Sequence, residues 1–396
     1  LINNRTLLVS SLTAQEQAQV SGLPSSTDRD TIAFNIPGGG VRTITAPPGS
    51  LPQITDSVTI DGYTQPGAFP NTLTTGSDAV LQIELRAGLT IVAPDCRVRG
   101  LVINSTGTAI QFFTAARNSI VEGNFIGTNA AGTAALSTGA GVLSSGGNLI
   151  GGTTPAARNV ISGNTSAGVV GQAGDVIQGN YIGTNAAGTA AVGNGGTFVV
   201  ATGGVRLGSG ATLGGTAVGA GNLISGNVQH GVLIQSGGAD NVVQGNFIGT
   251  NAAGTAALGN GLFASQHGVF LGHGATRNLI GGTAPGARNL ISGNGLAGVA
   301  ISGDFEHTFI SVASFNVVQG NLIGTDVTGT APIGNVYGVW LDRGAEDNLI
   351  GGTTPEARNV ISGNGNGVNI SGGARNLVQG NLIGTDIHGT AALGNS

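Results

Sequence analysis

The sequence predicts an all-β solenoid, a right-handed parallel β-helix whose coils each contain three short strands. Three observations lead to this prediction. Two short phrases alternate along most of the chain, their apolar residues have the period of two that is typical of strands, and glycine interrupts them too often for helices of ordinary length. A single repeat cannot bury a core of its own, so stability must come from stacking each coil on the next.

The composition excludes several other classes of protein. Of 396 residues, 74 are Gly and 12 are Pro, 40% are hydrophobic and only 8% are charged. Glycine falls short of the roughly one-third that collagen requires, and the chain is too apolar for a disordered protein. The net charge is −5 and all 14 basic residues are Arg, so no clustered basic face is available for nucleic acid.

Two further absences narrow the class. Gly, Asn or Thr breaks every apolar run well before it reaches the length of a membrane-spanning helix. The lone cysteine, Cys96, excludes an internal disulfide framework and a Cys-based metal site. A buried, inert thiol is the expected state of this residue.

The two phrases define the second strand of each coil. One reads Gly-Asn-Φ-Ile-Gly-Thr-Asn/Asp, where Φ is apolar, and the other reads Asn-Φ-Ile-Ser-Gly-Asn. Superposed, they share the frame Asn-Φ-Ile-x-x-Asn/Asp. We expect its first position to be a structural ladder, because Asn tolerates tight bends and its amide donates and accepts along a stack. The ladder residues are Asn124, Asn159, Asn180, Asn222, Asn246, Asn289, Asn321, Asn359 and Asn381.

The other two strands flank this frame. A second apolar column, from Val121 to Val378, precedes it, and a mostly amide column lies two residues earlier. A third strand, Gly-Val-x-Φ, follows in most coils. The Ile column recurs at intervals from 21 residues (Ile161 to Ile182) to 43 residues (Ile248 to Ile291), which indicates coils of constant size with loops of variable length.

The chain divides into a cap and one long domain. Residues 1–29 are expected to form an N-terminal cap with a short helix, because Thr13 and Glu16 have capping-box spacing. Residues 30–396 form a single parallel β-helix, with irregular coils over 30–107 and nine regular coils over 108–396. The C-terminal end has no comparable lid, so we expect further repeats or another protein chain to cover it.

The repeats resemble those of a known superfamily. The segments NLIGGTTPEARNVISGNGNGV (348–368) and VQGNLIGTDIHGTAALGN (378–395) resemble β-helix repeats of large secreted or surface-attached bacterial proteins in the pectate-lyase-like superfamily. Residues 30–67 resemble the opening strands of the same proteins. The resemblance implies a secreted or cell-surface location, but no single activity, since the superfamily includes lyases, hydrolases, epimerases, tailspikes and adhesins.

Enzymes of this superfamily place substrate over the third strand and its loops. In the outward column of that strand, Leu233, Phe270 and Trp340, with Tyr337 nearby, predict an exposed apolar stripe for glycan or partner binding. Loops that cover the stripe are the alternative interpretation.

The weak catalytic candidates lie around an insertion at 303–316. It carries Asp304, Glu306 and His307, and the next coil brings Asp342 and Arg343 one step away, so together they suggest a site for a metal or an acidic sugar. A solvated loop is the alternative. General acid–base catalysis needs two titratable groups that converge on one substrate, and the regular coils provide no such pair.

Two other histidine features are less specific. Pectin hydrolases of this fold carry four motifs, of which only Gly272-His273-Gly274 occurs here, and we interpret it as coincidence. His230 and His267 precede the third strand in consecutive coils and are expected within about 5 Å of each other. A polar ladder is favoured over a shared metal, because no third ligand is evident, and neither metal nor cofactor is predicted.

These observations favour a non-catalytic extracellular scaffold, structural or adhesive, that belongs to a longer repeat array or an end-to-end assembly. The alternative is a polysaccharide-binding protein or a polysaccharide lyase or hydrolase. The near-identical coils and the scarcity of titratable residues favour the scaffold over an enzyme. Expected partners are other protein chains or further repeats and a surface polysaccharide, with no nucleic acid and no membrane span.

Overall fold

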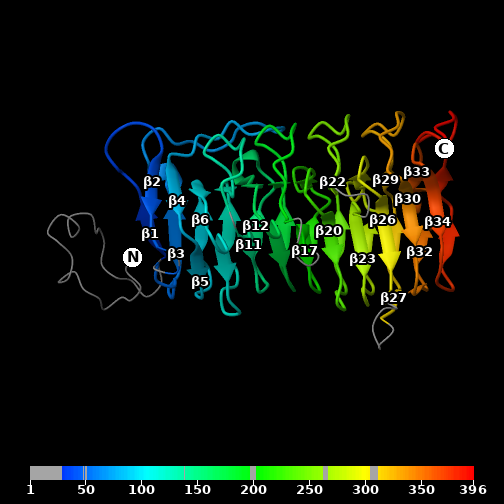
Figure 1. The fold of residues 1–396 in the computed structure, drawn as a ribbon, viewed down its shortest axis with the longest axis horizontal. Helices are drawn as coiled ribbons and strands as arrows, with labels where there is room; N and C mark the ends of the chain where they lie inside the picture. The colour runs from blue at the N-terminus through cyan, green and yellow to red at the C-terminus, as the bar shows by residue number, and fades with distance from the viewer. Residues whose placement is uncertain are drawn as a thin grey trace.

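The computed structural model describes residues 29–47, 49, 51–137, 139–196, 202–261, 266–303 and 311–396. Over these residues the chain winds into a rod of stacked coils, with three parallel sheets along its length (Figure 1). Sheets A and B contain 12 strands each and sheet C contains 10. The predicted right-handed parallel β-helix with three strands per coil is therefore confirmed.

The strands are short, and most contain two to five residues. Sheet A comprises β1 (Asp30–Ala33), β3 (Val58–Asp61), β6 (Arg97–Arg99), β9 (Ile120–Glu122), β12 (Leu149–Gly151), β15 (Val176–Gln178), β18 (Thr212–Gly214), β21 (Val242–Gln244), β24 (Leu279–Gly281), β28 (Val317–Gln319), β32 (Leu349–Gly351) and β35 (Leu377–Gln379). Sheet B comprises β2 (Arg42–Thr45), β4 (Ile83–Arg86), β7 (Leu101–Ile103), β10 (Phe125–Ile126), β13 (Val160–Ile161), β16 (Tyr181–Ile182), β19 (Leu223–Ile224), β22 (Phe247–Ile248), β25 (Leu290–Ile291), β29 (Leu322–Ile323), β33 (Val360–Ile361) and β36 (Leu382–Ile383).

Sheet C forms the third side of the rod. Its strands are β5 (Leu89–Ile91), β8 (Ile110–Phe112), β11 (Val142–Leu143), β14 (Val169–Gly171), β17 (Gly203–Leu207), β20 (His230–Ile234), β23 (Val269–Gly272), β26 (Ala297–Ser302), β30 (Tyr337–Leu341) and β34 (Asn366–Ile370). A small two-stranded sheet pairs β27 (Ala313–Ser314) with β31 (Ala345–Glu346). Three 3₁₀ turns, η2 (Gly62–Thr64), η3 (Pro155–Ala157) and η4 (Pro355–Ala357), lie outside the sheets.

The core is a stack of aliphatic side chains that runs the length of the rod. Equivalent residues pair directly, as Ile126 does with Ile161 and Ile161 with Ile182, and all three are fully buried. Because neighbours above and below supply most of the cover, burial of each Ile depends on the adjacent coils. The predicted Ile column is thus part of the inner face of sheet B.

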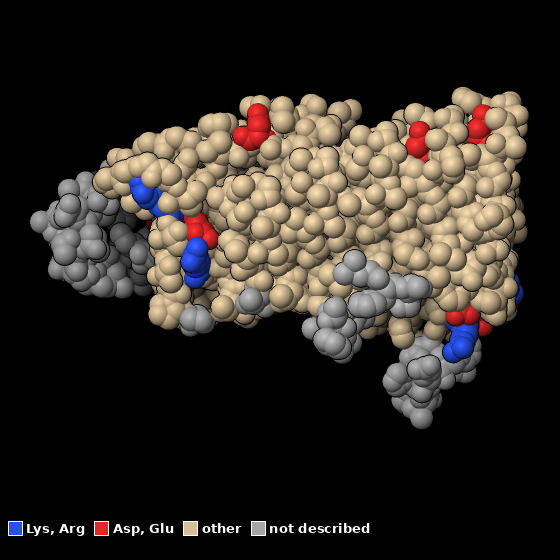
Figure 2. All heavy atoms as spheres, turned by 45° about the horizontal axis from the view of Figure 1, so that its top comes forward, with Lys and Arg blue, Asp and Glu red and all other residues tan. Residues whose placement is uncertain are grey.

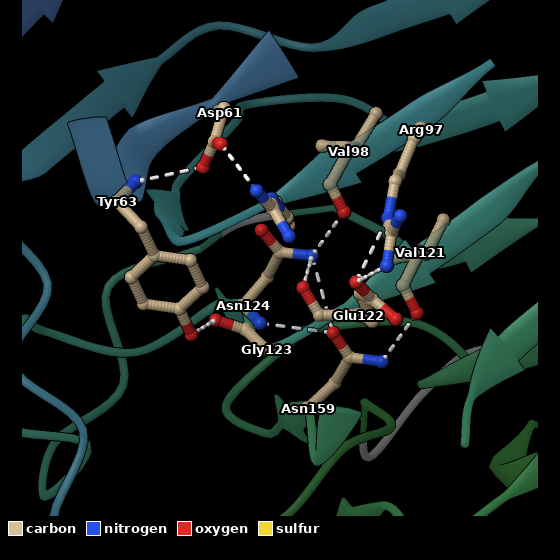
Figure 3. Close-up of polar contacts among 10 residues, drawn as sticks. Asp61, Tyr63, Arg97, Val98, Val121, Glu122, Gly123, Asn124 and Asn159 are labelled. Carbon is tan, nitrogen blue, oxygen red and sulfur yellow. Dashed lines mark hydrogen bonds and ion pairs between the residues drawn. The ribbon is translucent and has the colours of Figure 1, made fainter. Parts of the chain in front are cut away.

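The predicted Asn ladder is confirmed at all nine positions. Asn124 Nδ2 donates to Asn159 Oδ1 at 3.1 Å, and the same bond links each ladder residue to the next as far as Asn381. Figure 3 shows the start of the ladder, where Asn124 also donates to the Val98 carbonyl and Asn159 to that of Val121. The amides thus satisfy buried main-chain groups at the corner between sheets A and B.

Two further ladders occupy the other corners. The amide column before sheet A forms bonds of the same kind from Asn241 to Asn376. A third ladder, between sheets B and C, was not predicted; it joins Asn164, Asn194, Asn227, Asn260, Asn294, Asn335, Asn364 and Asn395. Each corner of the coil is therefore lined by hydrogen-bonded amides along much of the rod.

The superposed sequence frame was wrong at its last position. The frame equates Asn164 with Asn185, but the ladder partner of Asn164 is Asn194. Asn185 instead caps a loop, where its Oδ1 accepts from the main-chain N–H of Thr189 at 2.9 Å. Equivalent capping residues in the other loops of this kind are Asn129, Asn251, Asp326 and Asp386.

These capped loops follow sheet B in every second coil and stack on one another. The N–H of Ala186 donates to the Gly132 carbonyl at 2.8 Å, and the same contact joins later loops as far as Ile387 and Gly329. Gly132 has φ of +65°, and a Cβ there would lie 2.7 Å from the Ala186 Cβ, so the close approach requires glycine. The repeat that stacks as one unit is thus a pair of coils.

Three further predictions concern the N-terminal capping helix, membrane-spanning helices and Cys96. The predicted N-terminal capping helix lies outside the described residues, and the described ranges contain 3₁₀ turns but no α-helix. No helix in the described ranges is long and apolar enough to span a membrane. Cys96 is buried as expected, and burial raises the pKa of its thiol.

Candidate functional site

The outer face of sheet C carries one side chain from each coil in a straight row. Alternate residues of these strands point inward, such as Val232 and Val269, which are fully buried. The residues between them point outward and pair in register. The row includes Val170, Arg206, Leu233, Phe270, Ala300, Trp340 and Asn369.

The structure divides the predicted apolar stripe into covered and accessible parts. Phe270, Tyr337 and Trp340 are partly exposed, as a contact surface requires. Leu233 is fully buried, so its predicted role in an exposed stripe is not supported. The accessible part of the predicted stripe therefore consists of Phe270, Tyr337 and Trp340.

Five rings gather at this end of sheet C, and we call them the aromatic cluster. His230, His267 and Phe270 stack with ring centroids 5.0–5.3 Å apart. Trp340 lies 5.8 Å from His267 and 5.4 Å from Tyr337. The cluster forms because β20 and β23 are adjacent and β26, which lies between β23 and β30, has only the small side chains of Ala297 and Ala300 at the facing positions.

The two histidines are held as neutral members of this stack. His230 Nδ1 accepts the main-chain N–H of His267 at 3.1 Å, and His267 Nδ1 accepts that of Ala297 at 3.3 Å. Burial lowers the pKa of His230 to about 4, and burial together with His230 lowers the pKa of His267 to about 3. The predicted polar ladder is confirmed, and both rings serve as hydrogen-bond acceptors near neutral pH.

Trp340 is fixed by hydrogen bonds at its edge. Its Nε1 donates to Ser371 Oγ at 2.8 Å, and Ser371 Oγ donates to Asp342 Oδ1 at 2.9 Å. Asp342, one of the weak catalytic candidates, therefore orients the indole through Ser371. The ring face stays partly exposed, which suits contact with an apolar surface of a ligand.

A polar groove adjoins the row on its N-terminal side. It has a volume of about 700 Å³ and is lined mainly by hydroxyl and amide groups, among them Ser144, Ser145, Gln172, Ser209, Gln235 and Ser236. Arg206 lines the same groove, and its side chain is exposed. The groove thus offers neutral donors and acceptors around one cation.

The Gly272-His273-Gly274 motif has a structural explanation. A Cβ at Gly272 would lie 2.6 Å from two ring carbons of Phe270, so only glycine lets this ring lie across the strand. His273 and Gly274 follow with φ of +49° and +85° and form the turn that ends β23. The motif supports the aromatic cluster, and nothing links it to the catalytic motif of pectin hydrolases.

The remaining catalytic candidates are not brought together in the described structure. Asp304, Glu306 and His307 lie outside the described residues, and Arg343 follows Asp342 at the end of β30. Among the residues that the structure describes, no group of three or more His, Cys, Asp or Glu side chains is placed to hold a metal ion. The groups that the described part of sheet C and its turns offer to a ligand are therefore aromatic rings, amides, hydroxyls and the guanidinium of Arg206.

A charged cluster near the N-terminal end was missed in the sequence. Arg99 Nη2 lies 2.6 Å from Asp61 Oδ2, and Arg97 forms an ion pair with Glu122 (Figure 3). Tyr63 lies beside them and donates its hydroxyl to the Gly123 carbonyl at 2.8 Å. Burial, and to a lesser degree the charge of Glu122, raises the pKa of Tyr63. The sequence signal that could have revealed this cluster is the alternation of charged residues with valine in Arg97-Val98-Arg99 and Val121-Glu122, which lie in adjacent strands.

We interpret this N-terminal cluster as structural, because its charges are paired within the sheet. Figure 2 shows one face of the rod on which charged side chains lie near the ends and on the loop crests, with a wide uncharged area between them. On sheet C, Arg206 is an exposed cation, and the other row residues named above are uncharged.

No protein-family model matches the chain, and no curated protein matches it. Two solved structures from Azotobacter vinelandii are similar in architecture. The A-module of mannuronan C-5 epimerase AlgE4 is 13% identical, with a TM-score of 0.39 over 86% of this chain and 89% of that one. The A-module of mannuronan C-5 epimerase AlgE6 is 16% identical, with a TM-score of 0.37 over 87% of this chain and 91% of that one. We interpret the site from the residues of this chain alone.

Proposed function

We propose that this protein binds an extended acidic polysaccharide along the outer face of sheet C. The observation that carries the proposal is the in-register row that joins Arg206 to Phe270 and Trp340. At about 4.8 Å per strand, Phe270 lies about 10 Å and Trp340 about 19 Å from Arg206 along the axis. This spacing suits a ligand that lies along the rod and spans several sugar units.

The residue types fit the parts of such a ligand. A guanidinium binds carboxylates through paired, charge-assisted hydrogen bonds, so Arg206 suits a uronate or another acidic sugar. The hydroxyls and amides of the adjoining groove suit sugar hydroxyls. The partly exposed side chains of Phe270 and Trp340 suit the apolar faces of sugar rings.

The same residues favour binding over bond cleavage. His230 and His267 use Nδ1 for main-chain hydrogen bonds, and Asp342 is engaged through Ser371. General acid–base chemistry needs groups that are free to exchange protons near the operating pH, and burial moves the pKa of both histidines well below neutral. A rigid rod with a glycan-binding face also serves as an adhesive scaffold, and export from the cell remains a prediction.

The test measures binding of uronate-containing and neutral polysaccharides to the wild-type chain and two variants. We expect Arg206→Ala to weaken binding of the acidic polymer about tenfold, the range expected for a charged hydrogen bond, and to spare the neutral polymer. Trp340→Ala should weaken binding of both. Arg358→Ala, which removes an exposed Arg from the turn between sheets A and B, is the matched control.

Two results would overturn the proposal. One is equal binding of the acidic polymer by the wild type and Arg206→Ala, with both folded as judged by circular dichroism. The other is release of shortened, unsaturated or epimerised sugar products, which would establish an enzyme.

A further inference from the structure

A segment between β3 and β4 leaves the coil and lies across sheet B. We call residues 69–80 the strap; its ends are joined by two hydrogen bonds between Phe69 and Val80, both 3.0 Å. Figure 1 shows the chain between β3 and β4 running along the upper edge of the rod, over later coils. The strap is thus a loop that is closed at its base, bends at residues 74–76 and packs on the outside of the rod.

Arg158 holds the tip of the strap through main-chain carbonyls. Its Nη1 donates to Leu73 O at 3.0 Å and also to Gly76 O, and its Nη2 donates to Thr74 O at 2.7 Å. The guanidinium lies over the Tyr181 ring at 4.6 Å, and the Tyr181 hydroxyl accepts the Gly76 N–H at 2.8 Å. One Arg therefore binds three main-chain carbonyl groups at the bent tip of the strap.

The turn that carries Arg158 recurs along the same corner of the rod. Residues 151–158 read GGTTPAAR, 281–288 read GGTAPGAR and 351–358 read GGTTPEAR. Each turn lies between a strand of sheet A and a ladder Asn, so Arg288 occupies the position of Arg158 in a later coil. Arg288 Nε donates to Gly320 O at 3.0 Å, and its two Nη atoms have no partner among the described residues.

Two cavities connect the tip of the strap to Arg288. The first, about 320 Å³, is bounded by Thr74 and Thr75 of the strap, by the turn at 215–219 and by Leu223 and Phe247 of sheet B. The second, about 380 Å³, is lined by the turn at 282–286, Arg288 and Glu356, among others. Gly286 lines both cavities, so they adjoin at this residue, and we call the two cavities together the lane.

We infer that the lane is a docking site for a polypeptide segment of another molecule. Such a segment would lie beside the tip of the strap and place its main-chain carbonyls on the Nη atoms of Arg288. The strap is the reason to choose a polypeptide, because Arg158, at the same repeat position as Arg288, already binds main-chain carbonyls of the strap. Small side chains fit best, since glycine-rich turns line both cavities.

The test uses a fluorescent nine-residue peptide with the sequence of residues 71–79, NTLTTGSDA, in which a photoreactive residue replaces Leu73. We expect saturable binding to the wild-type chain and cross-linking to residues 282–288. Arg288→Ala should weaken binding at least fivefold, and Arg288→Lys should also weaken it, because an ammonium lacks the planar fork of Arg. Arg277→Ala, an exposed Arg in an ion pair with Asp240, is the control and should leave binding unchanged.

The outcomes separate this inference from its rivals. Cross-linking confined to residues 155–158 would mean exchange with the strap, and absence of saturable binding would mean that no lane exists; either result overturns the inference. Competition by an acidic polysaccharide would assign the lane to a glycan and would also overturn it. The inference does not depend on the polysaccharide proposal, whose test uses variants on sheet C.

Discussion

Asparagine is the residue on which the corners of this rod depend. Asn246 shows why: its Oδ1 accepts from both the main-chain N–H and the Nδ2 of Asn222, and its own Nδ2 donates to Leu213 O, Gln244 O and Asn289 Oδ1. No water reaches this fully buried side chain, so every bond that it loses leaves a buried polar group without a partner. A hydrophobic residue of similar size cannot replace it.

We predict that Asn246→Ala lowers the free energy of unfolding by about 2–4 kcal/mol, because several buried donors and acceptors lose their partners together. Urea titration followed by circular dichroism measures the change, and amide hydrogen exchange locates it. Asn366→Ala, at an exposed position of β34, is the control. Equal stability of the two variants would mean that the ladder contributes little.

The stacked histidines predict a dependence of stability on pH. Their pKa values in the folded chain, about 4 for His230 and about 3 for His267, lie below the value near 6.5 of an exposed imidazole. The unfolded chain therefore binds more protons below pH 6.5, and the free energy of unfolding should fall as the pH drops from 6.5 towards 4. The effect should be on the order of 3 kcal/mol for His230.

Thermal unfolding between pH 7 and pH 4 tests this dependence. The variant His230→Asn keeps an acceptor close to the position of Nδ1 but does not titrate, so its melting temperature should fall less with pH than that of the wild type. His388→Asn, in a loop near the C-terminal end, is the control for replacing a histidine outside the stack. Parallel curves for the wild type and His230→Asn would contradict the assignment.

At the scale of the element, loops and turns determine which segments of the chain a protease can reach. The strap depends on Arg158, so Arg158→Ala should release its tip without unfolding the coils. We expect limited proteolysis to cut the variant within residues 72–78 at least tenfold faster than the wild type, because local opening exposes the segment. Arg358→Ala removes the same residue from an equivalent turn that holds no strap, and it should leave the rate unchanged. Equal rates in all three proteins would show that other contacts hold the strap.

The elements also show how far sequence reasoning reaches. The strands and the Asn124 to Asn381 ladder were predictable, because each depends on a local pattern that recurs in every coil. The ladder through Asn194 was not, because a variable loop separates this residue from its strand and only the folded loop brings it back to the corner. Likewise, the burial of Leu233 depends on neighbours from other coils, which periodicity does not reveal.

The candidate site was predictable to a similar degree. Phe270 and Trp340 were found because they occupy one strand column, which Arg206 shares, and Tyr337 was found because it lies three residues before Trp340. The polar groove was not predicted, because its lining comes from turns after β11, β14, β17 and β20 that have no common motif. The strap and the charged cluster at Arg97 and Arg99 occur once, outside the repeats, so no internal comparison could identify them.

At the scale of the whole molecule, the unit that can be added or removed is a pair of coils. The core and the ladder between sheets A and B repeat in every regular coil, but the capped loops stack only in every second coil. Deleting residues 245–319 removes one complete pair and joins Gln244 to Gly320. Gly320 occupies the repeat position of Gly245, so the loop stacking is kept. Stability in such arrays is nearly a sum over repeats, so the shortened rod should fold with a proportionally lower free energy of unfolding.

Deleting residues 289–320 removes a single coil and joins Arg288 to Asn321. Asn321 then takes the place of Asn289 as the ladder residue after Asn246, so the core and the ladder between sheets A and B are preserved. It also brings the loops that begin at Asn251 and Asp326 from about 9.6 Å to about 4.8 Å apart, which is too close for their present contact through Gly254 and Val327. We therefore expect the single-coil deletion to be less stable than the longer deletion of 245–319, although it removes fewer residues. Urea unfolding and size-exclusion chromatography of both variants measure the order, and the reverse order would show that each coil, rather than each pair, is the structural unit.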